Sequence, residues 1–365
     1  PVELRLKNML EPGTETALGN PMPPGTGVKE TLREAALAAG WFEENGHWVR
    51  PELGAASTPS RRRGIGMASA FKNVCFPFGF DDKAAAEVDL HLHESGEIDW
   101  VDLRAGAVEM GQGVRTVLQQ FAADALDLEL GQVRVAVVDT AAVPDSGSAS
   151  ASRLTYIAGN AVIEACRQAE AQRRQVLREE TGEDLISAEH TYYARQKRPT
   201  TNFDPETGQC NPYISYSFGT QIALIEVDVA TGEVEVLKVW AATDAGRVIN
   251  PQMTFGQVAG GVHMGLGYAL MEQFIQQDGL VRTGRLSEYF IPTIKDMPKE
   301  LDSRNVEVPD PTGPFGAKGL GEITLVTTAP AILNAIHDAV GVRVPDLPAT
   351  SEKVWRAMQQ IKAAG

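Results

Sequence analysis

A seven-residue stretch near the C-terminus combines residue types that can carry out proton transfer. Gly316 to Glu322 reads Gly-Ala-Lys-Gly-Leu-Gly-Glu, which places three glycines, one lysine and one carboxylate together. Glycine tolerates positive φ and lets the backbone approach another group closely. A single acid at the end of such a turn, before a helix predicted to begin near Thr324, suits a general base. The same acid also fits the first turn of a helix, where the macrodipole favours negative charge, and the motif alone does not decide between these roles.

Two further stretches of small residues precede predicted helices. Gly111, Gln112 and Gly113 open a helix expected to run to about Leu128, and they offer backbone N–H groups and a side-chain amide to an anion. The serine-rich run 145–152 stands directly before a long helix predicted from Leu154. Such a run is either a flexible loop or a surface that lies flat against a bulky ligand. Two helix starts of this kind in one domain favour a phosphorylated cofactor.

Composition limits the classes of partner and site. The net charge of −15 argues against nucleic acid or an anionic membrane surface as the main partner. Cys75, Cys166 and Cys210 are far apart, so this chain supplies neither a disulfide framework nor an iron–sulfur or zinc site by sequence pattern. No apolar run reaches the ~18 residues of a membrane span. His91 and His93 lack a third ligand nearby and are more typical of the wet face of a strand than of a metal pair.

The predicted elements divide the 365 residues into three parts. Residues 1–63 form a helical N-terminal segment and linker, which ends in a polar, basic run, Ser57 to Arg63, expected to be a solvated connector. Residues 64–212 form a first subdomain, with the polar, irregular stretch 181–212 at its boundary. Residues 213–365 form a second subdomain with two long strands and a glycine-rich helix after Pro251. The pattern predicts an α+β protein of two mixed α/β subdomains.

Four motifs occur in order along the chain and carry a resemblance. They are Met110-Gly111-Gln112-Gly113, the small-residue run with Gly159-Asn160-Ala161, Gly256-Gln257-Val258-Ala259-Gly260, and Ala317 to Glu322. Together with Glu3 to Asn8, this set resembles the molybdenum-binding subunit of the xanthine dehydrogenase/aldehyde oxidase family. The resemblance covers nearly the whole chain and matches the C-terminal half of that subunit. It implies that the two subdomains together form this half of a molybdopterin-binding subunit.

The resemblance also implies a role for residues in each motif. A buried glutamate is the general base of this family, and Glu322 would be that base. The expected cofactor-binding residues are Gly111, Gln112 and Gly113 near the pterin phosphate, Ala151 and Ser152 along the pterin or nucleotide, Gln257 by a hydrogen bond, and Lys318 and Gly321 in the loop that presents Glu322. No residue of this chain is expected to ligate the metal directly. Phe76 or Phe78 would stack on the substrate, although a packed aromatic cluster explains that stretch equally well.

The cofactors and partners implied by the resemblance lie partly outside this chain. The expected cofactor is molybdopterin with molybdenum, in the cytosine dinucleotide form, and [2Fe–2S] clusters and FAD would reside on partner subunits. We expect a split enzyme of the nicotinate-dehydrogenase type, because no match to the other half of the subunit occurs here. Its partners would be a second molybdopterin-binding subunit carrying the N-terminal half, an iron–sulfur subunit and a flavin subunit. The alternative is a fragment of one longer chain.

The expected reaction is hydroxylation of an electron-poor carbon of an aromatic N-heterocycle, of purine or nicotinate type, with water as oxygen source. This chain would be active only in the complex. Three alternatives stay open: an aldehyde oxidoreductase subunit, a non-catalytic scaffold that clamps the cofactor, and an unrelated α/β protein in which the glycines merely turn the chain. The sequence begins with Pro1 and shows no signal peptide, and we expect a cytoplasmic location.

Overall fold

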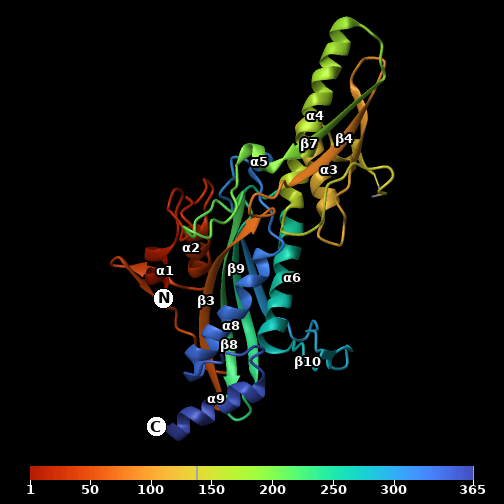
Figure 1. The fold of residues 1–365 in the computed structure, drawn as a ribbon. Helices are drawn as coiled ribbons and strands as arrows, with labels where there is room; N and C mark the ends of the chain where they lie inside the picture. Colours follow the sequence, from red (N-terminus) through yellow and green to blue (C-terminus); the bar gives the residue numbers. More distant parts are fainter. Residues whose placement is uncertain (137–138, 365) are drawn as a thin grey trace.

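Two four-stranded sheets organise the computed structural model, which describes residues 1–136 and 139–364 (Figure 1). The lower sheet in Figure 1 has the strand order β12-β9-β8-β3, and the upper sheet has the order β6-β5-β4-β7. Neighbouring strands run antiparallel except for the pairs β12–β9 and β5–β6. The strands are β3 (Arg61–Val74), β4 (Lys83–Leu92), β5 (Ile98–Ala105), β6 (Val133–Val135), β7 (Leu185–Tyr193), β8 (Ser215–Asp228), β9 (Val234–Asp244) and β12 (Glu300–Val306).

Helices cover both faces of the lower sheet. Helix α2 (Val28–Ala38) packs on one face, and α6 (Pro251–Leu270) and α8 (Thr328–Val340) pack on the other. Helix α8 lies close to β3 because β3 carries glycine at the contact. A Cβ atom on Gly66 would stand 2.2 Å from the backbone nitrogen of Ala335, so any larger residue would push the helix off the sheet. The short helix α7 (Ile323–Val326) precedes α8, and α9 (Ser351–Ala364) ends the chain.

The upper sheet is covered by α4 (Leu154–Glu179), which also packs against α3 (Val114–Leu126). Alternating strand residues such as Val88 and Leu103 join Phe121, Tyr156 and Ile157 in one buried core. The remaining elements are small: α1 (Val2–Asn8), β1 (Phe42–Glu44), β2 (His47–Val49), η1 (Leu130–Gln132), α5 (Ala194–Lys197), β10 (Gln276–Gln277), β11 (Leu280–Val281) and η2 (Pro314–Gly316).

The prediction of an irregular stretch at 181–212 was wrong in its first part. Strand β7 occupies Leu185–Tyr193 and pairs with β4 from Tyr193↔Lys83 to Leu185↔His91. Ile186 and Ala188 are buried on its inner face, while the alternating polar residues Ser187 and Glu189 are exposed. This alternation is the strand signal, and the polar outer face obscured it. The sequence also predicts a strand over 133–139. The structure has β6 at Val133–Val135, and residues 137–138 lie outside the described residues.

Strand β3 links two of the three predicted parts. It begins at Arg61 and pairs with β8 along its whole length, from Arg61↔Asp228 to Val74↔Ser215. The first residues of the predicted first subdomain therefore belong to the sheet of residues 213–365, whereas β4 to β7 form the other sheet. The division at 63/64 and 212/213 into separate folding units stays a prediction.

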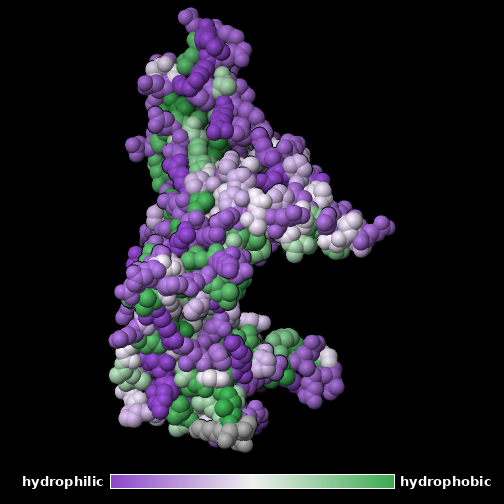
Figure 2. Space-filling view, turned by 90° about the vertical axis from the view of Figure 1, so that its left-hand side faces the viewer, coloured by the Kyte–Doolittle hydropathy of each residue, from purple (hydrophilic) through white to green (hydrophobic). Residues whose placement is uncertain are grey.

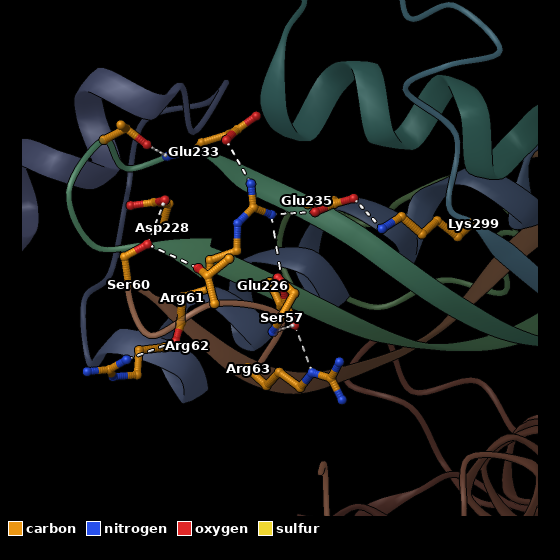
Figure 3. A network of polar contacts seen from close by, with 12 residues as sticks. Ser57, Ser60, Arg61, Arg62, Arg63, Glu226, Asp228, Glu233, Glu235 and Lys299 are labelled. Carbon is orange, nitrogen blue, oxygen red and sulfur yellow. Dashed lines mark hydrogen bonds and ion pairs between the residues drawn. The ribbon is translucent and has the colours of Figure 1, made fainter. Parts of the chain in front are cut away.

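The run Ser57 to Arg63 is exposed at Ser57 to Pro59 and at Arg62, as expected for a solvated connector, but Ser57 and Arg63 also bind a buried charge that we did not expect (Figure 3). The Glu226 side chain is fully buried on β8 and accepts hydrogen bonds from the Ser57 backbone N–H at 2.9 Å and from Arg63 Nε at 2.9 Å. Burial opposes its charge, but Ser57 and Arg63 outweigh burial and hold the pKa of Glu226 below its usual range. Arg61 and Arg63 of this run therefore neutralise Glu226 and its acidic neighbours Glu233 and Glu235.

One helical segment, 323–340, is long and apolar enough to cross a membrane by length and composition alone. Its main part is α8, which packs on β3 and β8, and half of the segment is buried. A core helix of this kind meets the same criteria.

Candidate cofactor site

A cavity of about 430 Å³ lies where elements of the two sheets meet. Its walls come from the loop before α4, the start of α6, and the two loops that contain residues 245–250 and 317–322. All four motifs of the sequence analysis reach this cavity. The predicted site residues on its wall are Gln112, Ala151, Ser152, Gln257, Lys318, Gly321 and Glu322.

Glu322 is held by side chains from two distant parts of the chain. Its Oε2 atom lies 2.7 Å from Ser152 Oγ, which donates a hydrogen bond, and 2.5 Å from Lys72 Nζ on β3. The Ser152 hydroxyl in turn accepts from the Glu322 backbone N–H at 3.2 Å. Two donors therefore occupy one oxygen of the carboxylate and fix its orientation.

The two interpretations of Glu322 are separated by this geometry. Glu322 is the N-cap residue of the four-residue helix α7, but its side chain makes no capping hydrogen bond. The carboxylate instead turns to Ser152 at the cavity. The expected burial is not found, since the side chain is 45% exposed. The loop before α7 therefore places Glu322 on a wall of the cavity that is open to solvent.

Glycine is required at one position of this loop and leaves room at another. A Cβ atom on Gly319 would stand 1.7 Å from the Ser152 carbonyl oxygen, so only glycine permits this approach. A Cβ on Gly321 would meet only Ser152 Oγ at 3.8 Å and Gln257 Oε1 at 3.9 Å. The space between Ser152, Gln257 and Glu322 is thus open to a ligand.

The Lys318 ammonium is bound by protein groups and does not point to the cavity as a ligand donor. Its Nζ atom donates to Asp244 Oδ2 at 2.6 Å and to the Gly25 carbonyl oxygen at 2.6 Å, and it lies 5.2 Å from the centre of the Phe218 ring. Burial lowers the pKa of Lys318 and raises the pKa of Asp244, because each charge loses its hydration, and their mutual attraction opposes both shifts. The pair fastens the 316–322 loop to β9.

The loop before α4 is wrapped around a buried arginine that the sequence analysis did not single out. Arg153 Nε donates to Asp82 Oδ1 at 2.8 Å, and its other nitrogens donate to the carbonyl oxygens of Ser146, Ser148 and Lys83. Both charged side chains are almost completely buried. Ala151, with φ 52°, and Ser152, with φ 51°, take the left-handed conformation and turn Ser152 toward Glu322. The loop is therefore held in one conformation. In the sequence, the arginine that follows the small-residue run was the signal for this buried ion pair.

The N-terminal amides of α3 are occupied, contrary to the free anion cradle that we expected. The Glu109 carboxylate accepts hydrogen bonds from the backbone N–H groups of Gly111 at 2.8 Å, Gly113 at 2.9 Å and Arg115 at 3.1 Å. Burial opposes the charge of Glu109, but these donors outweigh it and hold its pKa below the usual range. An acid two residues before the glycine motif was the signal for this contact.

Gln112 is fixed within the same loop. Its Oε1 accepts from the Met110 N–H at 2.6 Å, and its Nε2 donates to the Val108 carbonyl oxygen at 2.7 Å. Gly111 and Gly113 line a second hollow rather than the main cavity, and Met253 on α6 lines both. The two hollows are therefore neighbours along the start of α6.

The aromatic residues predicted for substrate stacking pack against each other. Phe76 contacts Phe80 edge-on, with ring centres 5.0 Å apart, and Phe78 lies against Tyr213 at 6.1 Å. Neither residue is on the wall of the 430 Å³ cavity as the described residues define it. This placement favours the packed aromatic cluster, and a substrate contact stays a prediction.

The two histidines on β4 are engaged with neighbours on β5. His91 stacks on Trp100 with ring centres 4.3 Å apart, and its Nε2 lies 2.9 Å from Asp102. His93 Nε2 lies 3.3 Å from Asp99. Within residues 1–136 and 139–364, no group of three or more His, Cys, Asp or Glu side chains is arranged to hold a metal ion.

The sequence model of the molybdopterin cofactor-binding domain matches residues 42–298. This chain belongs to that family, which confirms the predicted family. It is 29% identical to the xanthine dehydrogenase molybdenum-binding subunit of Escherichia coli O157:H7, over 97% of this chain and 49% of the relative. It is also 29% identical to 6-hydroxypseudooxynicotine dehydrogenase complex subunit gamma of Paenarthrobacter nicotinovorans, over 91% and 43%. The chain thus spans about half the length of these relatives.

Among solved structures, the chain is similar to the aldehyde oxidoreductase of Desulfovibrio gigas, with a TM-score of 0.77 and 26% identity. The match covers 98% of this chain and 38% of that chain. This likeness confirms the predicted α+β fold class.

The cavity fits the pterin group that the family binds. Its volume lies within the roughly 300–1,000 Å³ of ligand pockets. The small side chains of 149–152 form one wall, and the amide of Gln257 faces the gap beside Gly321. Hydroxyl, amide and backbone groups beside apolar side chains are the groups that a fused-ring cofactor with polar edges needs.

Proposed function

We propose that this chain supplies half of the molybdopterin site of a hydroxylase that acts on an aromatic N-heterocycle of purine or nicotinate type. The observation that carries this proposal is the position of Glu322, which faces the cavity with one carboxylate oxygen held by Ser152 and Lys72. The names of the two relatives, a xanthine dehydrogenase subunit and a 6-hydroxypseudooxynicotine dehydrogenase subunit, support a heterocyclic substrate.

In this proposal the molybdenum–pterin group, when bound, supplies the redox chemistry of the hydroxylation. Glu322 acts as the general base and takes a proton from the water that provides the oxygen. The proton goes to Oε1, because Oε2 already accepts a hydrogen bond from Ser152 and pairs with Lys72. Positioning of the base before reaction reduces the reorganisation that the transition state requires.

The other wall residues would bind and orient the cofactor. Gln257 would hydrogen-bond the pterin across the gap beside Gly321, and Ala151 and Ser152 would form the surface along which it lies. The second hollow, beside Gly111 and Gly113, adjoins the main cavity at Met253. This extended shape supports a dinucleotide form of the cofactor, and we propose the cytosine dinucleotide.

The remaining half of the site would come from partner chains. We propose a second molybdopterin-binding polypeptide, an iron–sulfur chain and a flavin chain, since this chain spans about half of its relatives. The three cysteines are unpaired and buried, which supports a reducing, cytoplasmic location. An aldehyde oxidoreductase subunit is the second candidate, and the similarity to the Desulfovibrio gigas enzyme favours it.

The test is Glu322→Gln in the complex purified through a tag on this chain. Molybdenum and pterin content should equal that of the wild type, because the substitution removes a base and leaves the cofactor walls intact. Turnover of purine- or nicotinate-type substrates should fall by about 10²–10⁴-fold. Glu164→Gln, on the exposed side of α4, is the matched control and should retain activity. Undiminished turnover in Glu322→Gln would refute the assigned base, and turnover of aldehydes alone would favour the second candidate.

A further inference from the structure

Helix α6 exposes a continuous stripe that begins at the cavity. Met253 and Gln257 line the cavity, and the stripe continues through Gly260 to the exposed side chains of Met264 and Tyr268. Steps of three or four residues place these positions on one face of the helix. A Cβ atom on Gly260 would meet nothing within 4 Å, so this face is uncovered within the described residues. The opposite face, with Val258, Val262 and Leu266, is buried against the lower sheet and α8.

Residues 272–298, here called the arm, project from the lower end of α6 (Figure 1). The arm leaves large apolar side chains in solvent: Phe274, Leu280, Leu286, Phe290, Ile291 and Ile294. Leu286 is 77% exposed and Ile294 is 85% exposed. Isolated exposed apolar residues are ordinary, but six large ones within 27 residues of chain indicate an interaction site.

The base of the arm is fixed to α6. His263 Nε2 on α6 lies 2.8 Å from the Pro292 carbonyl oxygen of the arm, and within the arm Tyr289 Oη donates to Glu272 Oε2 at 2.6 Å. A Cβ atom on Gly267 would stand 2.7 Å from the Pro292 ring, so glycine lets the arm lie directly on the helix. These contacts hold the Pro292 part of the arm against α6.

The arm borders a concave region of the molecular surface. Figure 2 shows two projections on the right with a hollow between them, and the lower one carries hydrophobic surface where it joins the body. The lower projection stands at the height of the β10 hairpin in Figure 1. A partner seated in this hollow would bury the arm and at the same time cover the side of the cavity that Met253 and Gln257 border.

We propose that the stripe and the arm are one docking surface for the second molybdopterin-binding polypeptide of the complex. This inference rests on the proposed function. The curated relatives are about twice as long as the region they share with this chain, so an equal length of polypeptide has no counterpart here. A chain of that length is large enough to cover both the arm and the open side of the cavity. A second copy of this chain would bring a second cavity with the same open side.

The experiment uses the intact complex with a photo-crosslinking amino acid, p-benzoylphenylalanine, at single positions of this chain. Replacement of Tyr268, Leu286 or Ile294 should give crosslinks to the polypeptide that corresponds to the remaining half of the relatives, identified by mass spectrometry. Leu37 on α2 is 54% exposed on the other side of the lower sheet and is the matched control, which should give no such crosslink. Crosslinks from the three test positions to a second copy of this chain, to an iron–sulfur or flavin polypeptide, or to nothing would overturn the proposal.

A second measurement addresses the strength of the contact. Ile294→Asp and Leu286→Asp should weaken association of the two purified polypeptides by about tenfold or more, whereas Leu37→Asp should not. Equal affinity in all three variants would contradict the docking surface.

Failure of the proposed function and failure of the docking surface give different results. A complex without molybdopterin, or with active Glu322→Gln, refutes the proposed function, while crosslinks elsewhere in a molybdopterin-loaded complex refute only the docking surface.

Discussion

Lys318→Met should destabilise the chain through the partner that it leaves behind. The Lys318 ammonium and the Asp244 carboxylate are 1% and 0% exposed, and they meet at 2.6 Å. Methionine keeps most of the apolar stem, so the packing beside Phe218 is largely retained. The substitution leaves a buried carboxylate without its cation. Loss of one partner of such a pair costs about 3–5 kcal/mol, whereas neutral replacement of both partners is often close to neutral.

The double substitution Asp244→Asn with Lys318→Met isolates this effect. The asparagine amide would keep an acceptor for the Gly246 N–H, which now donates to Asp244 Oδ1 at 2.9 Å. We expect the double variant to recover most of the stability lost in the single variant. Urea unfolding followed by circular dichroism and tryptophan fluorescence measures both. If Lys318→Met is as stable as the wild type, or if the double variant is no more stable than the single one, the reasoning is refuted.

The pH dependence of unfolding gives an independent test of the stability loss expected for Lys318→Met. Burial raises the folded-state pKa of Asp244, and removal of Lys318 removes the attraction that opposes this shift. A carboxyl with a raised folded pKa favours folding below its unfolded value of about 3.9 and loses that contribution as pH rises through the folded value. The deficit of Lys318→Met relative to the wild type should therefore be largest at neutral pH and should shrink as the solution is acidified.

Three further substitutions test other contacts of the site. Lys72→Met should lower turnover of the complex about fivefold at unchanged molybdenum content, since a half-exposed pair contributes about 1 kcal/mol, and Lys72→Arg should restore it. Glu109→Gln should destabilise the chain in urea by about 1–2 kcal/mol at neutral pH. Because the pKa of Glu109 is depressed, its stabilisation is present above the unfolded value of about 4.3 and is lost as pH falls through the folded value, so this difference should disappear in acid. Gly319→Ala would place a Cβ 1.7 Å from the Ser152 carbonyl and should reduce turnover far more than Gly131→Ala, whose Cβ meets nothing within 4 Å.

The meeting of the four motifs in one cavity was predictable because glycines and small residues occur where the backbone must approach another group closely. Gly319 is required by its approach to the Ser152 carbonyl, and Gly66 by the packing of α8. Such requirements are local properties of the chain, so they appear in the sequence as patterns. Strands with alternating apolar residues, such as β4, were predictable for the same reason.

Contacts between distant charges were not predictable in this way. Lys72 reaches Glu322 only because β3 pairs with β8 beneath the 316–322 loop, and Asp244 reaches Lys318 only because β9 passes under that loop. In the sequence these residues resemble ordinary surface charges. Glu109 was missed for the opposite reason, since its partners Gly111 and Gly113 are so near that the free helix start seemed available to a ligand.

The two donors on Glu322 belong to different structural units, although the end of β3 and the loop before α4 are neighbours, since the Cys75 N–H donates to the Ala151 carbonyl oxygen at 3.1 Å. Lys72 belongs to β3 in the lower sheet, and Ser152 stands at the end of the loop that feeds α4 over the upper sheet. A rotation of one sheet against the other would change the distance between these two donors. The orientation of Glu322, the proposed base, therefore depends on how the two sheets are packed against each other. Substitutions far from the cavity, in either sheet, should be able to silence the chemistry while the cofactor stays in place.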